Sequence, residues 1–458
     1  MAFSWASHGN RNCDVMKNEG PACPALLVAA PASGQGKTTV TAALARLHAR
    51  QGRRVRVFKC GPDFLDPHWL ELACGHPVHP LDLWMTGPQD CAARLHAAAA
   101  EADLMLVEGV MGLYDGTPSA ADIALRFRLP VLAVIDAAAM AQTFGALAHG
   151  LQSYRDGLRW AGVLANRVAG EAHAAMLRES VREPQHWRGA LPGEPRLAWP
   201  ERDLGLVSTS ESPDALQRLD AMADRLAATP LGRMTADDLV QWSTRFSAPA
   251  AEPLPAGLLA GRTIAIARDA AFGFIYPANL DCLLAMGARL AFFSPVAGDP
   301  LPACDAAWLP GGYPELHLPA LGQARALRDA LARHVEAGKP LWAECGGMLP
   351  LFERMATADG AVQALWGLLP GTVRMQQRPA AVGPQQLALP QGVLRGHSFH
   401  FSRCESPLAP ALRTSAPDGR PGEAVWRSGA LLATYFHAWF PSCPQAVAAI
   451  LRREALLP

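Results

Sequence analysis

The feature that most constrains the fold of this chain is a pattern of short apolar segments that alternate with helical periodicity. The pattern begins at the apolar segment 25–30, and it restarts at segment 263–269 after a stretch rich in Pro and Ala, residues 246–259. Short apolar strands that alternate with helices are typical of a parallel sheet covered by helices on both faces. Pro-rich stretches are typical of linkers. We therefore predict an α/β protein with two successive sheet domains.

The same pattern predicts where each part begins and ends. We expect a flexible leader over residues 1–23, a first domain over 24–245, a linker over 246–260 and a second domain over 261–450. The predicted strands are 25–30, 55–59, 103–108, 130–136 and 161–166 in the first domain, and 263–269, 289–295, 305–312, 340–344 and 430–437 in the second. Two domains agree with a length of 458 residues, because one domain usually holds about 100–200 residues.

The charge balance and the distribution of apolar residues exclude several classes of protein. Lys and Arg together number 41, as do Asp and Glu, so the formal net charge is zero, whereas nucleic-acid binders normally have a strong basic excess. No apolar run approaches the ~18 residues that span a bilayer, and no signal-peptide pattern opens the chain. The ten cysteines include no C-x-x-C pair. We therefore expect a cytoplasmic protein with free thiols that binds neither nucleic acid nor membrane.

The segment 30–38, APASGQGKT, lies between a predicted strand and a predicted helix, which is the context of a phosphate-binding loop. Its small residues allow backbone N–H groups to approach phosphate oxygens, and the following helix N-terminus attracts negative charge. Lys37 is expected to reach the β- and γ-phosphates, and the Thr38 hydroxyl is expected to hold Mg²⁺. Ala30 replaces the first Gly of the usual motif, and an ordinary glycine-rich turn is the alternative.

The nucleotide site is expected to extend to the end of a later strand. Asn166 ends the predicted strand 161–166, where an Asn side chain can contact the edge of adenine; a simple turn residue is the alternative. The predicted ATP-binding residues are Ser33, Gly34, Gly36, Lys37, Thr38, Thr39 and Asn166.

Acidic residues follow the ends of two predicted strands of the first domain. Asp63 and Asp66 follow the second strand, whereas Glu108 ends the third and Asp115 follows it. Ligands of open α/β sheets bind outside the carboxyl ends of the strands, and carboxylates crowded there need a cation to offset their repulsion. Solvated loop carboxylates and a strand-end lysine are the alternatives. The predicted ligands of Mg²⁺ are Thr38, Asp63 and Glu108, and the predicted residues on the substrate side are Lys59, Asp66 and Asp115.

In the second domain, Cys345 lies between an apolar strand and a helix-like stretch, in the sequence WAECGGM. A cysteine on such an elbow is expected to be strained and exposed, with its pKa lowered by the helix N-terminus. The adjacent glycines leave room for substrate, and their backbone N–H groups can form an oxyanion hole. The alternative is a buried cysteine that acts as a small apolar side chain. The predicted oxyanion residues are Gly311, Gly312 and Gly346.

A cysteine nucleophile needs a histidine that is close in space rather than in sequence. We select His437, in TYFHAWF at the end of a late strand, as the catalytic base of Cys345. His397 and His400 are the competitors, and their alternation suggests strand residues that face one side in a structural or substrate-lining role.

A series of motifs runs through the whole chain in a fixed order. They are SGQGKTT (33–39), FKCGPDFLDP (58–67), LDLWM (81–85), EGVMGLYDG (108–116), ERDLGLV (201–207), LPGGYPEL (309–316), AECGGM (343–348), RGHSFHFS (395–402) and TYFHAWF (434–440). Each motif is moderately specific, and their joint order is highly specific. Together they resemble the family of cobyrinate or hydrogenobyrinate a,c-diamide synthases, over about Ala25 to Phe440.

The resemblance implies a dethiobiotin-synthetase-like P-loop domain fused to a class I glutamine amidotransferase domain. It implies that Cys345 releases ammonia from L-glutamine through a thioester, and that Mg-ATP phosphorylates a carboxylate of a corrin-ring polycarboxylate. Ammonia then displaces phosphate and leaves an amide. Family enzymes treat the c and a acetate side chains in turn, with one ATP and one glutamine for each. By this resemblance, Thr38 matches the family's metal-binding hydroxyl, Cys345 its nucleophile and His437 its base. The family's acidic positions are matched by Asp63, Asp66, Glu108 and Asp115.

Two positions depart from the family pattern. Trp439 occupies the position two residues after the histidine, where many class I glutaminases have Glu, so the third triad member is unidentified. Asp203 stands where a His is expected, which puts details of substrate recognition in question.

Three other functions fit part of the sequence. Cobyric acid synthase and nickel-sirohydrochlorin a,c-diamide synthase are related enzymes, and KCGPDFLDP with EGVMGLYDG fits a cobyrinate-type diamide synthase better than cobyric acid synthase. A partitioning-type switch ATPase is a different class, but it carries a Lys where this chain has Ala32, and it has no use for an elbow cysteine. A homodimer is one option for the assembly.

Overall fold

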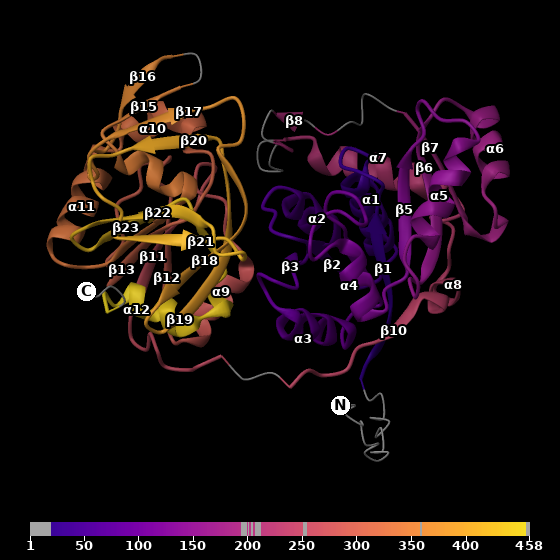
Figure 1. The fold of residues 1–458 in the computed structure, drawn as a ribbon, viewed down its shortest axis with the longest axis horizontal. Helices are drawn as coiled ribbons and strands as arrows, with labels where there is room; N and C mark the ends of the chain where they lie inside the picture. The colour runs from indigo at the N-terminus through magenta and orange to yellow at the C-terminus, as the bar shows by residue number, and fades with distance from the viewer. Residues whose placement is uncertain are drawn as a thin grey trace, which may run out of the picture.

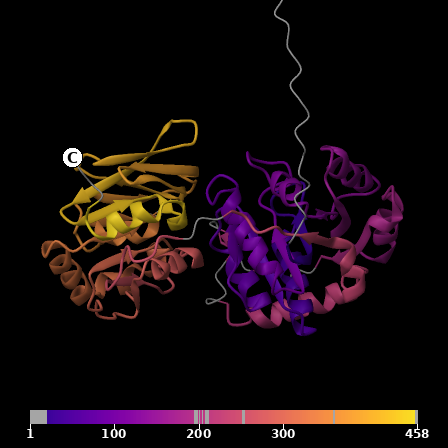
Figure 2. The same ribbon diagram turned by 90° about the horizontal axis from the view of Figure 1, so that it is seen from below.

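The computed structural model describes residues 20–193, 199, 201–202, 205–206, 212–250, 254–357 and 360–454. In these parts the chain forms two α/β domains that lie side by side, and their connection runs along one edge of both (Figure 1). Seen from below, the second domain has its C-terminal elements, in yellow, on one side and its earlier helices, in orange, on the other (Figure 2). The position of Asp203 lies outside the described residues.

The first domain is built on a parallel sheet with the strand order β3-β2-β4-β1-β5-β6-β7, and β10 is added antiparallel to β1. Its strands are β1 (Ala22–Ala29), β2 (Val55–Cys60), β3 (His79–Leu81), β4 (Leu104–Glu108), β5 (Val131–Asp136), β6 (Trp160–Val168), β7 (Trp187–Pro192) and β10 (Ser243–Arg245). A separate short pair consists of β8 (Glu201–Arg202) and β9 (Gly205–Leu206). The helices are α1 (Lys37–Arg50), α2 (Asp66–Cys74), α3 (Pro88–Ala99), α4 (Ala120–Phe127), α5 (Thr143–Ser153), α6 (Glu171–Ser180), α7 (Ala215–Ala227) and α8 (Ala236–Leu239), with 3₁₀ turns η1 (Pro184–His186) and η4 (Val240–Trp242).

Helices cover both faces of this sheet, which is why its strands are apolar along their whole length. Leu44 of α1 and Trp69 of α2 are buried on one face, together with residues of α7. Leu95 of α3 and Phe144 of α5 are buried on the other face, together with residues of α4. The predicted parallel sheet between two helical layers is therefore confirmed for the first domain.

The second domain has a mixed sheet with the strand order β12-β11-β13-β14-β23-β22-β21-β18-β19-β24. The strands from β12 to β23 are parallel neighbours, and the rest are antiparallel. The parallel half is β11 (Thr263–Ala267), β12 (Arg289–Phe293), β13 (Ala306–Leu309), β14 (Leu341–Glu344) and β23 (Leu431–Thr434); the antiparallel half is β18 (Ala381–Leu389), β19 (Gly392–His400), β21 (Leu412–Ser415), β22 (Pro421–Ser428) and β24 (His437–Ala438). A smaller sheet holds β15 (Arg354–Ala356), β16 (Val362–Ala364), β17 (Thr372–Met375) and β20 (Ser402–Glu405).

The helices of the second domain are α9 (Pro277–Ala285), α10 (Leu318–Gln323), α11 (Arg325–Glu336) and α12 (Pro444–Leu451), with 3₁₀ turns η5 (Pro314–His317), η6 (Cys345–Leu351) and η7 (Phe440–Ser442). The helices α9 and α11 pack on the parallel half of the sheet, α12 contacts both β14 and β19, and α10 contacts the smaller sheet at β16. The predicted strand 430–437 is corrected by this structure. The strand β23 ends at Thr434, and the chain then crosses to pair His437 with His397 of β19.

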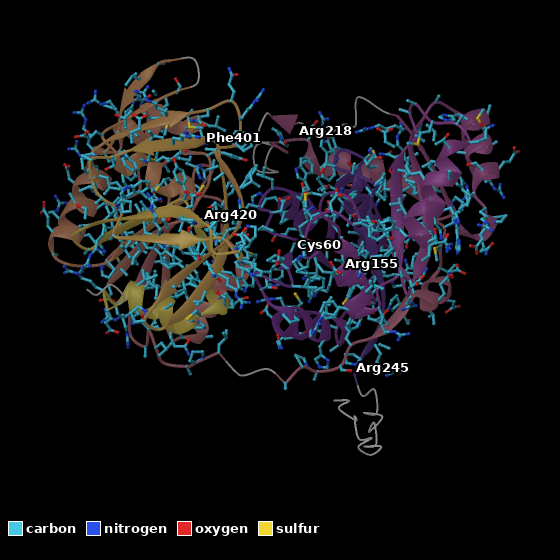
Figure 3. The ribbon with its side chains drawn as sticks, in the orientation of Figure 1. Cys60, Arg155, Arg218, Arg245, Phe401 and Arg420 are labelled. Carbon is cyan, nitrogen blue, oxygen red and sulfur yellow. The ribbon has the colours of Figure 1, made fainter. Side chains whose placement is uncertain are left out.

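The described ends of the predicted leader and linker are part of the two domains. β1 begins at Ala22, which pairs with Arg245 of β10, so the last residues of segment 1–23 belong to a sheet. Arg245 also donates a hydrogen bond to the carbonyl of Gly20 at 3.0 Å, at the point where the connection leaves the first domain (Figure 3). Phe246 is buried in the first core and Leu259 in the second. The exposed connection is therefore shorter than the predicted linker 246–260.

Within the part of the chain that the structure describes, none of the helices combines the length and the apolar character needed to cross a lipid bilayer.

Candidate functional site

The turn between β1 and α1 is held in shape by the end of β6. Gly36 has a left-handed backbone with φ 95°, and a Cβ at this position would lie 2.2 Å from Nδ2 of Asn166. Only glycine fits such a position. Nδ2 of Asn166 donates a hydrogen bond to the carbonyl of Gln35 at 2.9 Å, and Oε1 of Gln35 accepts one from the backbone of Asp136 at 2.8 Å. The predicted phosphate-binding loop and Asn166 therefore lie together at the carboxyl ends of β1, β5 and β6.

Lys37 places its ammonium group inside this loop. Nζ donates to the carbonyl of Ala32 at 3.1 Å and to that of Met111 at 2.7 Å. Burial lowers the pKa of Lys37, and the nearby charge of Lys59 lowers it further. The other predicted loop residues are more open: Ser33 and Gly34 are exposed at the tip of the loop and Thr39 is half-buried.

Five polar side chains, from α1, β2, α2, β4 and the loop between β2 and α2, converge beside the phosphate-binding loop. The Thr38 hydroxyl donates to Oε1 of Glu108 at 2.6 Å and lies 3.4 Å from Oδ2 of Asp66. Nζ of Lys59 donates to Oδ2 of Asp66 at 2.6 Å and to Oε1 of Glu108 at 3.0 Å. Asp63 is the outermost member, with Oδ2 at 3.9 Å from Nζ of Lys59. The strands β1, β2 and β4 are neighbours in the sheet, which is why their following residues meet here.

The charges of this cluster are coupled. Burial alone would lower the pKa of Lys59, but the carboxylates of Asp66 and Glu108 outweigh burial and hold this pKa well above its ordinary value. Burial and the repulsion of Asp66 raise the pKa of Asp63 to about 7. Burial opposes ionisation of Asp66, yet the charge of Lys59 holds the pKa of that carboxyl below its ordinary value. Within this cluster one lysine therefore faces three carboxyl groups, and a further cation would offset the remaining negative charge.

The donor set fits a magnesium ion that is shared with phosphate. Glu108 is fully buried, and its Oε2 has no hydrogen-bond partner among the described residues; such an orphan oxygen is costly unless a partner arrives. Thr38, Asp63 and Glu108 offer only oxygen ligands, which Mg²⁺ prefers. Within the described ranges no group of three His, Cys, Asp or Glu side chains forms a metal cage by itself.

Asp115 shapes the loop that follows β4. Its Oδ2 accepts a hydrogen bond from the backbone of Gly112 at 2.8 Å, and its charge acts on Lys37 and raises the pKa of that residue. Asp115 thus lies close enough to Lys37 to affect the pKa of that residue.

In the second domain three neighbouring strands deliver the predicted glutaminase residues to one edge of the sheet. β14 lies between β13 and β23, and Cys345 directly follows β14. Gly311 and Gly312 follow β13, and His437 follows β23 by three residues. Cys345 has a left-handed backbone with φ 47°, which is strained for a residue with a side chain. The predicted strained elbow is therefore present.

The glycines around Cys345 permit two chain segments to touch. A Cβ on Gly346 would lie 2.2 Å from the carbonyl oxygen of Gly312, and a Cβ on Gly347 would lie 2.3 Å from that of Leu309. Any larger residue would separate the elbow from the segment after β13. Gly312 and Gly346 also line one small cavity with Cys345, so these two predicted oxyanion residues are placed beside the thiol.

The predicted exposure and low pKa of Cys345 are wrong for this structure. The residue is 5% exposed and is followed by the 3₁₀ turn η6 instead of an α-helix, so the expected helix dipole is weak. Burial raises the pKa of the thiol, and the charges of Glu315 and Glu423 raise it further. The thiol faces a cavity of about 30 Å³, lined also by Phe274, Tyr313 and Leu349.

His437 is buried beside the segment that follows β13. A Cβ on Gly311 would lie 2.3 Å from Cε1 of its imidazole, so Gly311 is the wall of the ring's compartment. Burial lowers the pKa of His437 well below its ordinary value, and the neighbouring His397 and His400 lower it further. Its Nδ1 has no hydrogen-bond partner among the described residues. The imidazole is therefore neutral at physiological pH and has a free nitrogen.

His397 and His400 do not share one environment, which corrects the expectation that they face one side. They are three residues apart on β19, and positions an odd number apart on a strand point to opposite faces. His397 stacks on His437 with ring centroids 4.9 Å apart. His400 lines the cavity of Cys345, lies 3.1 Å from Oε1 of Glu423 through Nε2, and lies 2.8 Å from the carbonyl of Ser402 through Nδ1.

Sequence reasoning missed an aromatic residue that joins the two domains. Phe64 follows Asp63 in the first domain, and its ring stacks on Phe274 of the second domain at 4.9 Å with an interplanar angle of 2°. It also lies 4.4 Å from the ring of Tyr276 and 5.0 Å from that of His437. The only available signal was an aromatic residue in a short loop between two acidic residues, Asp63 and Asp66.

The domain contact continues on either side of Phe64. Trp439, Tyr276 and Met85 are buried together, with Trp84 packed against them. Arg395 of the second domain donates to the carbonyl of Trp84 at 3.0 Å. A cleft of about 550 Å³ opens next to this contact and is lined from both domains, with Asp63 and Phe64 on one side and Phe274, Tyr276 and Tyr313 on the other. Phe274 and Tyr313 line the cavity of Cys345 as well.

Two family descriptions match the two domains. The CobQ/CobB/MinD/ParA nucleotide binding domain matches residues 26–207, and the CobB/CobQ-like glutamine amidotransferase domain matches residues 263–444. The first match covers the phosphate-binding loop and the carboxylate cluster, and the second covers Cys345 and His437.

The chain is also similar to named proteins over nearly its whole length. It is 57% identical to the hydrogenobyrinate a,c-diamide synthase of Stutzerimonas stutzeri, over 94% of this chain and 99% of that protein. It is 54% identical to the hydrogenobyrinate a,c-diamide synthase of Pseudomonas aeruginosa, over 94% and 97%. It is 48% identical to the cobyrinate a,c-diamide synthase of Herminiimonas arsenicoxydans, over 96% and 99%.

Proposed function

The chain belongs to the cobyrinate and hydrogenobyrinate a,c-diamide synthase family, and from this premise we propose that it converts the a and c acetate carboxylates of a corrin-ring precursor to amides. It is an amide-forming ligase that uses ATP and takes nitrogen from glutamine. The observation that carries the proposal is the presence of both required sites in one chain. The phosphate-binding loop and the carboxylate cluster lie at the edge of the first domain's sheet, and the cysteine elbow lies at the edge of the second domain's sheet.

Nitrogen release begins with a neutral pair of catalytic residues. The thiol of Cys345 has a raised pKa and the imidazole of His437 a lowered one, so both are uncharged at rest. His437 takes the thiol proton while the sulfur attacks the carboxamide carbon of glutamine. The proton then passes to the leaving nitrogen, and ammonia departs from a thioester that water hydrolyses to glutamate. Backbone N–H groups of Gly312 and Gly346 are placed to stabilise the oxyanion.

Carboxylate activation takes place at the loop between β1 and α1. Lys37 exchanges its two carbonyl partners for phosphate oxygens and stabilises the charge on the transferred phosphoryl group. Thr38, Asp63 and Glu108 would hold Mg²⁺, which supplies further charge neutralisation when bound. Lys59 and Asp66 keep the first domain's acidic cluster compact. An acyl phosphate forms because a carboxylate is a poor electrophile until its O⁻ becomes a leaving group.

The decisive experiment is a product analysis. The purified protein is incubated with cobyrinate or hydrogenobyrinate, Mg-ATP and glutamine, and the products are measured by mass spectrometry. Two exchanges of hydroxyl for amino group are expected, and the preferred ring identifies whether the natural substrate contains cobalt. Four exchanges would favour cobyric acid synthase instead, and ATP turnover without any carboxylate acceptor would favour a switch ATPase.

Two variants separate the half-reactions. Cys345→Ala is expected to lose glutamine-supported amidation and to keep ammonia-supported amidation, because the thiol serves only nitrogen release. Lys37→Ala is expected to lose amidation with both nitrogen sources, because it acts on the phosphates. Loss of both activities in Cys345→Ala would contradict separate functions for the two domains.

A further inference from the structure

The base of the glutaminase site lacks the partner that usually orients such a histidine. In nucleophile–base pairs a third group, most often a carboxylate, fixes the imidazole through a hydrogen bond. Here Trp439 occupies the position where that acid was expected, and Nδ1 of His437 has no hydrogen-bond partner among the described residues. The orientation of the imidazole must therefore come from packing.

Two rings, those of Phe64 and His397, lie closest to the imidazole of His437, and the ring of Phe274 lies farther away at 6.2 Å. The centroids of Phe64, His397 and His437 form a triangle with sides of 4.9, 5.0 and 5.6 Å. Gly311 closes the compartment at Cε1 of His437. Two of the three walls belong to the second domain, whereas Phe64 belongs to the first. The glutaminase domain alone therefore leaves one side of its base uncovered.

Two hydrogen bonds brace the loop that carries Phe64, and this loop leads directly into the synthetase site. Oδ1 of Asp63 accepts hydrogen bonds from the backbone of Leu65 at 2.9 Å and of Asp66 at 3.1 Å. Phe64 lies between these anchored residues, so its position follows that of the carboxylate cluster. Its ring is fixed from the other side by the stacked ring of Phe274.

We propose that Phe64 is a positioning residue of the glutaminase: it holds the imidazole of His437 in place from the other domain and substitutes for the missing triad acid. The inference rests on the proposed role of His437 as the base. It follows that glutamine hydrolysis requires the synthetase domain to be docked, with its loop in the arrangement described above. Phe64 does not touch the reacting atoms, so its effect is on the rate of nitrogen release and not on glutamine binding.

The test compares Phe64→Ala with Phe64→Tyr in the full-length protein. We expect Phe64→Ala to lower kcat for glutamate release by about tenfold to 100-fold, as for a catalytic group displaced by about 1 Å, with KM for glutamine changed less than about twofold. Ammonia-supported amidation is expected to stay near the wild-type rate. Phe64→Tyr keeps the ring and is expected to restore kcat. Trp84→Ala is the matched control. It also removes a large aromatic residue from the contact between the domains, but Trp84, unlike Phe64, has no ring contact to His437 in the described structure.

Two outcomes would overturn the proposal. A glutaminase kcat for Phe64→Ala that equals the wild-type value would show that the imidazole is oriented without this ring. Equal losses of kcat in Phe64→Ala and Trp84→Ala would show that Phe64 acts only through general docking. The proposed function is tested separately, by the number of amides that the wild-type protein forms, and that number does not depend on Phe64.

Discussion

The contact between Gly311 and His437 allows the effect of adding one methyl group, in the variant Gly311→Ala, to be worked out from the structure. An alanine at position 311 would place its Cβ 2.3 Å from Cε1 of the imidazole, whereas a carbon–carbon contact needs about 3.5 Å. The imidazole would therefore have to move by about 1.2 Å, the difference between these distances. Its compartment offers little room, because His397 stacks on the ring and Phe64 lies 5.0 Å from it.

A displacement of this size predicts a selective loss of nitrogen release. Misplacing a catalytic group by about 1 Å costs about 100-fold in rate, which corresponds to about 2.7 kcal/mol in the activation barrier. We expect Gly311→Ala to reduce glutamate release and glutamine-supported amidation by about this factor. Ammonia-supported amidation is expected to remain, since the carboxylate cluster lies in the other domain.

The assay measures glutamate release and amide formation in parallel, with glutamine and with ammonium chloride as nitrogen source. Gly273→Ala is the matched control, because a Cβ there meets only the carbonyl of Asp269 at an ordinary 3.5 Å. If Gly311→Ala retained more than half of the wild-type glutaminase rate, His437 could not be the base in the described position. A parallel loss of ammonia-supported activity would show instead that the substitution unfolds the protein.

Three further predictions concern the charges of the two sites. Lys59→Met leaves the buried carboxylate of Glu108 without its cation, so the free energy of unfolding in urea should fall by about 3–5 kcal/mol. Lys339→Met removes an exposed lysine and one hydrogen bond to the carbonyl of Cys304, so it should lower this free energy by only about 1 kcal/mol; equal effects would contradict a buried ion cluster. The lowered pKa of His437 keeps the base neutral as pH falls through 6.5. The rate of glutamate release should therefore begin to fall with decreasing pH only below pH 6.5. A fall centred at pH 6.5 or above would contradict a buried neutral imidazole. Both ring nitrogens of His400 have partners, so His437→Ala should lower glutamate release far more than His400→Ala, and the reverse order would make His400 the base.

Much of each site was predictable because it depends on local sequence and strand order. Gly36-Lys37-Thr38 begins a helix after a strand, and the strand ends that carry Glu108 and Cys345 were recognised from their apolar segments. In a parallel sheet such ends meet at one edge whatever the intervening loops contain. The alternation of strands and helices therefore places residues that are distant in sequence into one site.

The protonation states of the glutaminase residues were not predictable in the same way, because they depend on what covers the site. The thiol of Cys345 was expected to have a lowered pKa from its elbow alone, but the cavity walls that bury it come from β19 and from the segment after β13. Likewise, nothing in the sequence around His437 announces that its imidazole packs against Phe64, more than three hundred residues earlier in the chain. Local patterns specify which atoms react. The tertiary packing of the second domain determines their protonation states, and the ring of Phe64 from the first domain adds a contact to the imidazole of His437. Phe64 is the residue that connects the two sites and that no motif marks as catalytic: its apolar ring follows Asp63 of the acidic cluster and packs against Phe274 and His437 of the other domain.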